Sequence, residues 1–382
     1  MSTQSKPVQR NSGLSEVAID SATSKDLEAI YTIEQTSFHG DRLTRRALRY
    51  LLDRGHATRL VARIAGQAIG YAVTLYRRGT SMARLYTLAV LPEFRGQGVA
   101  TQLLERCEAD AREAGCVTMR LEVRADNQAA MQLYREHGYV QFRIKDDYYE
   151  DHERALCLEK RLRFPVPVHR LDLVYYPQTT EFTCGPAALM MALRFLQPAF
   201  EFSQQIELQL WRESTTIFMT SGHGGCGPHG LALAAYRRGY EVAAWISHNG
   251  PMFVESVRDK QKKQVIALVQ QSFEDEISHT AIAMHHAVPD LARIKRVIDQ
   301  GGVPLALISS YRIDRSKSPH WVVVSGYDDH FIYIHDPYWD RDQTFDVLSD
   351  RTYMPIPEES FWSMARFGTN RVSAFLFICR PV

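Results

Sequence analysis

Two prolines that stand two residues apart, Pro165 and Pro167, divide this chain of 382 residues into two parts with different sequence patterns. Before them, helical and strand-like runs alternate; after them, one strongly apolar helical run is followed mainly by strand-like runs. Proline fixes φ, so the segment that contains the pair is expected to be extended and stiff. A chain of this length usually forms two domains. We therefore expect a polar disordered leader over residues 1–15, an α/β domain over 16–163, a linker over 164–172 and an α+β domain over 173–382.

The composition excludes several classes of protein. Lys and Arg number 45 and Asp and Glu 44, a formal charge of +1, whereas a dedicated nucleic-acid binder needs a surplus of cations for phosphate. No apolar run approaches the roughly 18–20 residues that span a bilayer, and the N-terminus has no apolar signal segment. Six unclustered cysteines are typical of reduced thiols. These observations predict a cytoplasmic protein without nucleic-acid or membrane partners.

A glycine-containing loop in the first half lies between a predicted strand and a predicted helix. The strand covers 83–90, the loop reads Arg95-Gly96-Gln97-Gly98, and the helix covers 98–114. Glycines at a helix start let the backbone approach a ligand, and the free amides with the helix dipole favour an anion such as pyrophosphate. Arg95 adds a cation. Taken alone, the loop is equally consistent with a plain tight turn.

This loop and a later segment resemble the GNAT acetyltransferases. The pyrophosphate loop of that family has the pattern Arg/Gln-x-x-Gly-x-Gly/Ala, which Arg95, Gly98 and Ala100 match. The run LEVRADNQAAMQLYREHGY at 121–139 and the run Asp147-Tyr148-Tyr149-Glu150 are most similar to the bacterial ribosomal-protein-alanine N-acetyltransferases. The resemblance covers roughly residues 17–162. It implies a GNAT fold, a mixed central sheet with flanking helices, and acetyl-CoA as the cofactor.

The resemblance also implies a role for individual residues. Glu122 would be the general base that removes a proton from the incoming amine, and Tyr134 the acid that protonates the leaving thiolate. Without the resemblance, a strand glutamate such as Glu122 usually faces solvent, and a helical tyrosine such as Tyr134 usually packs in the core. The residues expected to bind the cofactor are Leu88, Ala89, Val90, Arg95, Gly96, Gln97, Gly98, Val99, Ala100 and Asn127.

A cysteine at a predicted helix start marks a second site, in the second half of the chain. Cys184 precedes Gly185-Pro186, and proline is common in a first helical turn. A thiol there is exposed to the positive end of the helix dipole, which lowers its pKa and prepares a nucleophile. Gln178, six residues upstream, offers an amide for an oxyanion. His320 opens one predicted strand and Asp336 follows the next, so adjacent antiparallel strands would bring them together.

These four residues resemble the papain-like cysteine peptidases that remove double-glycine leaders from bacteriocin precursors. The family has a Gln, a Cys-Gly six residues later, a His at a strand start and an Asp-Pro, which Gln178, Cys184-Gly185, His320 and Asp336-Pro337 match. The resemblance covers roughly residues 170–382 and implies that Cys184, His320, Asp336 and Gln178 are catalytic.

Two alternatives concern the other cysteines. Cys226-Gly227-Pro228 repeats the local triplet of Cys184, but Thr220 stands where the glutamine would be. His223, Cys226 and His229 have metal-like spacing without a fourth ligand, so we predict no metal. The remaining cysteines, expected to pack in cores, are Cys107, Cys116, Cys157 and Cys379.

The two patterns together predict a bifunctional enzyme. One domain would transfer acetyl from acetyl-CoA to an amine, expected to be a peptide or protein N-terminus, and the other would hydrolyse a peptide bond, in peptide maturation. Cleavage creates an N-terminus that acetylation could cap. The alternative is an acetyltransferase whose papain-like domain only binds the peptide. The sequence does not indicate an oligomeric state.

Overall fold

The computed structural model describes residues 17–53, 56–163, 168–215, 224–254, 257, 259–314, 318–338, 351–366 and 371–381. The chain forms two compact units. One comprises the chain up to Tyr76 together with Ala83–Arg163, and the other comprises Arg77–Met82 together with the chain after Arg163. The segment Arg77–Met82 is thus grouped with the second unit. The predicted leader over residues 1–15 and the prolines of the predicted linker lie outside the described residues.

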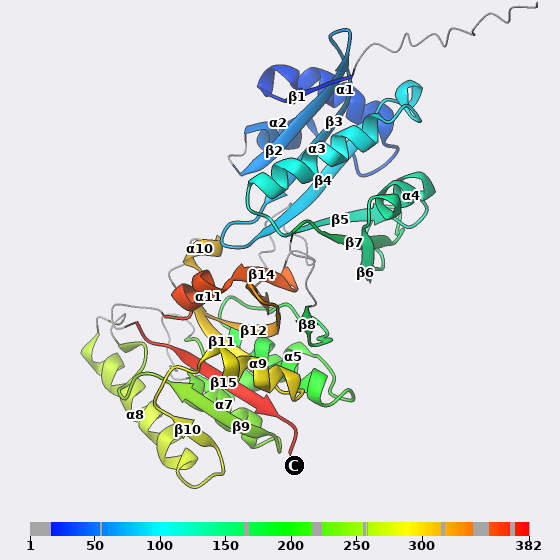
Figure 1. Ribbon diagram of the computed structural model, residues 1–382. Helices are drawn as coiled ribbons and strands as arrows, with labels where there is room; N and C mark the ends of the chain where they lie inside the picture. Colours follow the sequence, from blue (N-terminus) through cyan, green and yellow to red (C-terminus); the bar gives the residue numbers. More distant parts are fainter. Residues whose placement is uncertain are drawn as a thin grey trace, which may run out of the picture. The chain divides into compact units, whose positions relative to one another are not determined.

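The first unit is built on a seven-stranded sheet with the order β1-β2-β3-β4-β5-β7-β6 (Figure 1). β1 pairs with β2, β2 with β3, β3 with β4, and β7 with both β5 and β6, each pair antiparallel. The strands are β1 Ala18–Ser21, β2 Ala57–Ile64, β3 Gln67–Tyr76, β4 Met82–Val90, β5 Thr118–Arg124, β6 Val140–Lys145 and β7 Ala155–Arg161.

Two helices of the first unit, α1 and α3, pack an apolar side against this sheet. α3 packs against β2 and β3, and α1 packs against β3 and α2. α3 shows why: Leu103, Leu104, Cys107 and Ala111 recur at helical spacing and are fully buried. The helices are η1 Ser24–Asp26, α1 Leu27–Ser37, α2 Arg45–Asp53, η2 Pro92–Phe94, α3 Val99–Glu113 and α4 Gln128–Glu136.

The second unit is built on a longer sheet with the order β10-β9-β15-β11-β12-β13-β14, and β8 pairs with β12 beside that path. β10 and β9 are parallel, and the other pairs are antiparallel. β12 is buried along nearly its whole length, as expected of a central strand. The strands are β8 His169–Arg170, β9 Glu241–Ile246, β10 Ala283–His285, β11 Val303–Ser309, β12 Pro319–Tyr327, β13 Phe331–His335, β14 Met354–Pro357 and β15 Ala374–Cys379.

The central helix of the second unit is α5, which begins at Cys184. Every residue from Cys184 to Leu193 is buried, and the helix packs against β12 and β11. A helix that is apolar all round must lie inside the core, so the start of α5 is held rigidly. The helices are α5 Cys184–Leu196, α6 Gln204–Ser214, α7 Pro228–Tyr236, α8 Lys260–Ile277, α9 Leu291–Asp299, α10 Tyr311–Asp314 and α11 Glu358–Met364.

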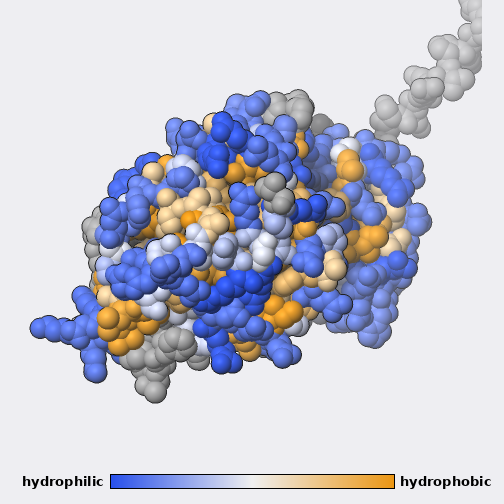
Figure 2. Space-filling model, turned by 90° about the horizontal axis from the view of Figure 1, so that it is seen from below, coloured by the Kyte–Doolittle hydropathy of each residue, from blue (hydrophilic) through white to orange (hydrophobic). Residues whose placement is uncertain are grey.

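Five of the six cysteines are buried and Cys379 is partly exposed; all six are free thiols. Figure 2 shows that hydrophobic residues on one face form separate patches between hydrophilic ones. Among the described residues, no helix combines the length and the hydropathy needed to cross a membrane.

Candidate active sites

The predicted phosphate loop leads into α3 through two glycines with left-handed backbone. Gly96 has φ +74° and Gly98, the N-cap of α3, has φ +79°, a region that favours glycine. No side chain caps this helix start, no acidic residue lies in its first turn, and a Cβ on either glycine would meet no atom within 4 Å. An anion could therefore approach the start of α3 without displacing a capping side chain. This arrangement fits the pyrophosphate of acetyl-CoA.

Arg95 anchors the loop to the protein. Its Nε donates to the Val90 carbonyl at 3.1 Å, and one terminal nitrogen donates to the Ser37 carbonyl at 3.2 Å. The Ser37 hydroxyl also donates to the Val90 carbonyl, at 3.3 Å. Arg95 thus joins the loop to the ends of β4 and α1, whereas the sequence suggested only a cation beside phosphate. Leu88 and Ala89, the other two expected cofactor contacts on β4, lie opposite Ala72 and Tyr71 of β3.

Glu122 lies on β5 between two cations. Its side chain is only 5% exposed, so it does not face solvent as a strand glutamate commonly does. Oε2 accepts from Arg84 Nε at 3.0 Å, and Oε1 accepts from Lys145 Nζ at 3.2 Å. Both cations are themselves nearly buried, and the Lys145 ammonium lies 4.9 Å from the centre of the Tyr148 ring. These contacts fix the carboxylate in one orientation.

Tyr134 and Asn127 belong to the helix that follows β5. Tyr134 is buried in α4, with its ring edge-on to Tyr139 at 5.6 Å between centres. Burial raises the pKa of the Tyr134 hydroxyl above its ordinary value near 10, so the hydroxyl is protonated at neutral pH and holds its proton more firmly than an exposed tyrosine. Asn127 is the N-cap of α4, and its Oδ1 accepts from the Ala130 amide at 3.1 Å. Its side chain has this structural role in addition to the expected contact with the cofactor.

The second site brings Cys184, His320 and Asp336 together from three elements. Cys184 begins α5, His320 lies in β12 and Asp336 directly follows β13, which pairs with β12. His320 Nε2 lies 2.6 Å from Asp336 Oδ1, so Nδ1 is the nitrogen that hydrogen-bonds the Cys184 sulfur. On the far side of Asp336, Arg351 donates to Oδ2 at 2.7 Å. Arg351 is buried like the other three residues, and no sequence motif marks it.

The three residues that form this hydrogen-bonded row, Cys184, His320 and Asp336, all have shifted pKa values. Burial acts to raise the pKa of the Cys184 thiol, but the His320 imidazolium and the Gly185 and Trp321 amides outweigh it, so the pKa is lowered. Burial opposes the charge on His320, yet Asp336 and Cys184 raise its pKa to about 10. Arg351 and His320 overcome burial and lower the pKa of Asp336 far below its usual range. A thiolate–imidazolium pair is therefore favoured at neutral pH.

Gln178 lies beside this row but donates within its own loop. Its backbone amide donates to the Pro337 carbonyl at 2.8 Å, which fixes the loop next to Asp336. Its side-chain Nε2 donates to the Thr180 carbonyl at 2.8 Å, and Oε1 is buried without a hydrogen-bond partner among the described residues. Nε2 carries a second hydrogen, which the expected oxyanion could accept.

Glu207, on α6, holds the loop that leads to Cys184. It is fully buried and accepts from the Thr179 amide at 2.8 Å, the Thr179 hydroxyl at 2.7 Å and the Tyr176 hydroxyl at 2.9 Å, and also from the Thr183 hydroxyl. These charge-assisted hydrogen bonds fix both ends of the segment that contains Gln178. Glu207 could not be predicted from the sequence, because nothing distinguishes it from other glutamates of an amphipathic helix.

Cys226 lies close to Cys184 but in a different environment. A Cβ on Gly185 would lie 3.2 Å from the Cys226 Cβ, and Trp321 Nε1 donates to the Cys226 carbonyl at 3.0 Å. Burial and the neighbouring Cys184 sulfur raise the pKa of Cys226 well above its usual value. This thiol is thus poorly suited to be a nucleophile.

The suggested histidine–cysteine metal spacing finds no support in the part of the chain that is described. His223 lies outside it, and His229 is buried with its Nε2 3.6 Å from a Glu274 carboxylate oxygen. No group of three or more potential metal ligands is found among the described residues.

The pKa shifts predict how the reactivity of Cys184 depends on pH. In the parent protein the thiolate should form below the ordinary pKa near 9 and stay paired with His320 until the pH passes about 10. In His320→Ala the opposing effect of burial remains, so the alkylation midpoint should move to higher pH. Iodoacetamide labelling of the Cys184 peptide, followed by mass spectrometry from about pH 5 to 10, measures both midpoints. Equal midpoints would contradict the ion pair.

Comparison with known protein families assigns a family to each half of the chain. The chain belongs to the Peptidase_C39 like family (DUF3335), whose model matches residues 173–379, and its first unit belongs to the Acetyltransferase (GNAT) family, whose model matches residues 27–139. These matches confirm both predicted resemblances and the predicted fold class. They also confirm acetyl-CoA as the cofactor of the GNAT unit.

Individual relatives match the first unit. [Ribosomal protein bS18]-alanine N-acetyltransferase of Salmonella typhimurium is 38% identical over 79 residues, 20% of this chain and 53% of that protein, so the chain spans about half of its length. The uncharacterized N-acetyltransferase MJ1530 of Methanocaldococcus jannaschii is 33% identical over 140 residues, 36% of this chain and 88% of that protein. The solved ribosomal-protein-S18-alanine N-acetyltransferase of Escherichia coli is 28% identical, with 39% of this chain and 96% of that chain covered and a TM-score of 0.37.

Proposed function

We propose that this protein is a bifunctional enzyme of peptide maturation, which hydrolyses a peptide bond at Cys184 and acetylates an amine at the GNAT site. The observation that carries the peptidase half is the hydrogen-bonded row from Cys184 through His320 to Asp336, with the thiol pKa lowered and the imidazole pKa raised. Membership of both families supports the two halves.

Hydrolysis follows from the geometry of the row. The Cys184 thiolate attacks the peptide carbonyl, and a carbon–sulfur bond forms while the carbonyl oxygen takes the negative charge. Gln178 Nε2 is the proposed side-chain donor to this oxygen. The His320 imidazolium gives its Nδ1 proton to the leaving amine, the carbon–nitrogen bond breaks, and a thioester remains. His320, now neutral, takes a proton from water, whose oxygen displaces the sulfur and releases the acid.

The acetyltransferase half uses residues of the first unit. Acetyl-CoA supplies the acetyl group, and the start of α3 together with the Arg95–Ala100 loop would hold its phosphates. Glu122 takes a proton from the incoming amine, directly or through water, and Tyr134 holds the proton that the leaving group needs. The relative that acetylates an alanine N-terminus supports a peptide or protein N-terminus as the acceptor. A cut by the second unit would create such an N-terminus.

The two activities can be tested on one sample. The full-length protein is incubated with a peptide library, with and without acetyl-CoA, and the products are analysed by mass spectrometry. We expect cleaved peptides in both samples, and acetyl groups on the new N-termini only where acetyl-CoA is present. Acetylation without any cleavage would favour a second unit that only binds the peptide. Absence of both products would contradict the proposal.

A further inference from the structure

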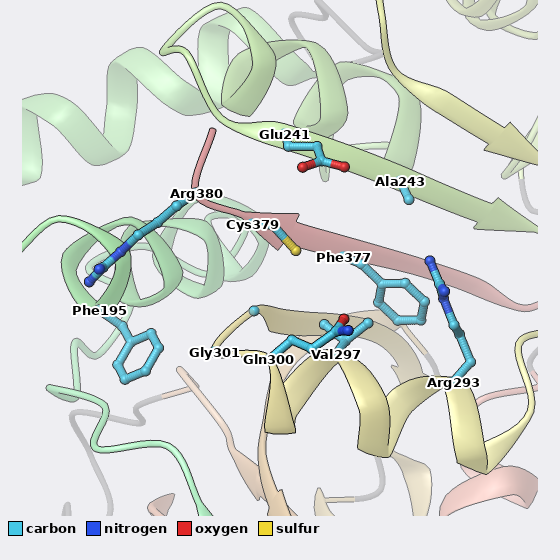
Figure 3. Close-up of a pocket in the computed structure, with 11 residues that line it drawn as sticks. Phe195, Glu241, Ala243, Arg293, Val297, Gln300, Gly301, Phe377, Cys379 and Arg380 are labelled. Carbon is cyan, nitrogen blue, oxygen red and sulfur yellow. The ribbon is translucent and has the colours of Figure 1, made fainter. Parts of the chain in front are cut away.

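A cavity of about 400 Å³ opens in the second unit, outside the Cys184 row. Its sheet wall comes from β9 and β15, where Glu241 lies opposite Cys379 and Ala243 opposite Phe377 in the antiparallel register. Residues directly opposite each other share one face of a sheet, so these four side chains line the same face. Figure 3 shows Cys379 and Phe377 pointing from β15 toward α9.

The second wall of the cavity is one side of α9 with the residues that follow it. Arg293 and Val297 stand one helical turn apart, and Gln300 follows the helix end. Phe195 of α5 closes another side. Because Phe195 stands near the end of α5 and Cys184 at its start, the two ends of the helix lie about 17–18 Å apart. The cavity is therefore separate from the candidate peptidase site.

Two opposite charges face this cavity without neutralising each other. The Arg293 guanidinium forms no hydrogen bond or ion pair with a described residue, and its Nε is buried without a partner. Glu241 likewise makes no ion pair with Arg293 or with another described residue. Both act on the Cys379 thiol: burial raises its pKa, the Glu241 carboxylate raises it further and Arg293 lowers it.

Arg380, which also lines the cavity, already donates a hydrogen bond to the protein. Arg380 donates through Nε to the Leu196 carbonyl at 2.7 Å, and Figure 3 shows its side chain directed away from Arg293. Phe195, Val297 and Phe377 add apolar surface to the lining, with Phe195 on the side of Arg380 (Figure 3). A guanidinium, a carboxylate and apolar surface in one cavity complement a molecule with a carboxylate, an ammonium and an apolar side chain.

We infer that this cavity binds a zwitterionic ligand, a free apolar α-amino acid or a short apolar peptide, with its carboxylate on Arg293 and its ammonium on Glu241. This site is additional to the proposed hydrolysis and acetyl transfer and does not depend on either. Amino acids and short peptides share the required chemistry, so the experiment compares leucine with leucyl-leucine.

The inference is tested by calorimetric titration of the full-length protein with four probes. Leucine and leucyl-leucine have both charges, N-acetyl-leucine lacks the ammonium, and leucinamide lacks the carboxylate. We expect saturable binding of at least one zwitterion and a loss of at least tenfold for each singly charged analogue, because charged hydrogen bonds contribute about one to two orders of magnitude. Whichever of leucine and leucyl-leucine binds more tightly shows whether the ligand is a free amino acid or a short peptide. Leucinamide that binds as tightly as leucine, or no saturable binding at all, would overturn the inference.

Variants assign the binding to the cavity. Glu241→Gln should weaken the binding of leucine but not that of N-acetyl-leucine. Arg293→Met should weaken the binding of leucine but not that of leucinamide. Arg296→Met, an exposed arginine on the same helix, is the matched control and should bind as the parent does. Leucine should also slow the alkylation of Cys379, which lines the cavity. Zwitterion binding that survives both Glu241→Gln and Arg293→Met belongs to another site and would refute the proposal. Thermal unfolding verifies that each variant is folded.

Discussion

Cys184→Ala is expected to abolish peptide hydrolysis, because the substitution removes the atom that forms the thioester. Residual cleavage should fall to the level of a blank without enzyme. Acetyl transfer to an amine that needs no cleavage should stay near the parental rate, since Glu122 and Tyr134 belong to the other compact unit. Mass spectrometry of peptide products, together with a separate assay of acetyl transfer, measures both activities.

Cys226→Ala is the matched control for this experiment. Cys226 is a second buried thiol beside Cys184, but burial raises its pKa, so its loss should leave cleavage intact. Cleavage that is lost in Cys226→Ala and kept in Cys184→Ala would reverse the assignment of the nucleophile. Cleavage that survives in both variants would exclude a cysteine nucleophile at this site.

Tyr134→Phe and Glu122→Gln are expected to lower acetyl transfer by about 10²–10⁴-fold each, the usual contribution of a general acid or base. Tyr134→Phe keeps the buried ring and removes only the proton donor, so the affinity for acetyl-CoA should change little. Steady-state rates with an N-terminal peptide acceptor and calorimetric titration with acetyl-CoA separate the two effects.

The matched control for the tyrosine variant is Tyr139→Phe. Tyr139 packs edge-on against Tyr134, and its buried hydroxyl interacts with Glu108, which has no proposed part in acetyl transfer. Removing that hydroxyl should therefore leave acetyl transfer near the parental rate. If Tyr134→Phe is as active as Tyr139→Phe, the acid is another group.

The sequence predicted the elements whose patterns are local. The helix start at Cys184, the strand that contains His320 and the strand before Asp336 each have a strong pattern of their own, and the short connection between the two strands favoured antiparallel pairing. The glycine loop before α3 was predictable for the same reason, since Gly96 and Gly98 mark the left-handed backbone that it requires.

The partners of these residues could not be predicted, because they come from distant segments that have no motif. Arg351 forms a hydrogen bond with Asp336, and Glu207 forms one with the loop before Cys184. Arg84 and Lys145 both donate to Glu122. Each of these contacts forms only after the sheets have formed. The middle of the second unit was also unpredicted. Residues 200–289 contain α6, α7, β9, α8 and β10, for which no local motif was found.

The row that begins at Cys184 has a consequence for long-range electrostatics. Thiolate, imidazolium, carboxylate and guanidinium alternate in sign from Cys184 through His320 and Asp336 to Arg351, and their charges sum to zero. The field of such a neutral alternating row decays much faster with distance than that of a single charge. Peptides would thus be neither attracted nor repelled by this row from afar, and selection among them would depend on the contacts they make once they are bound.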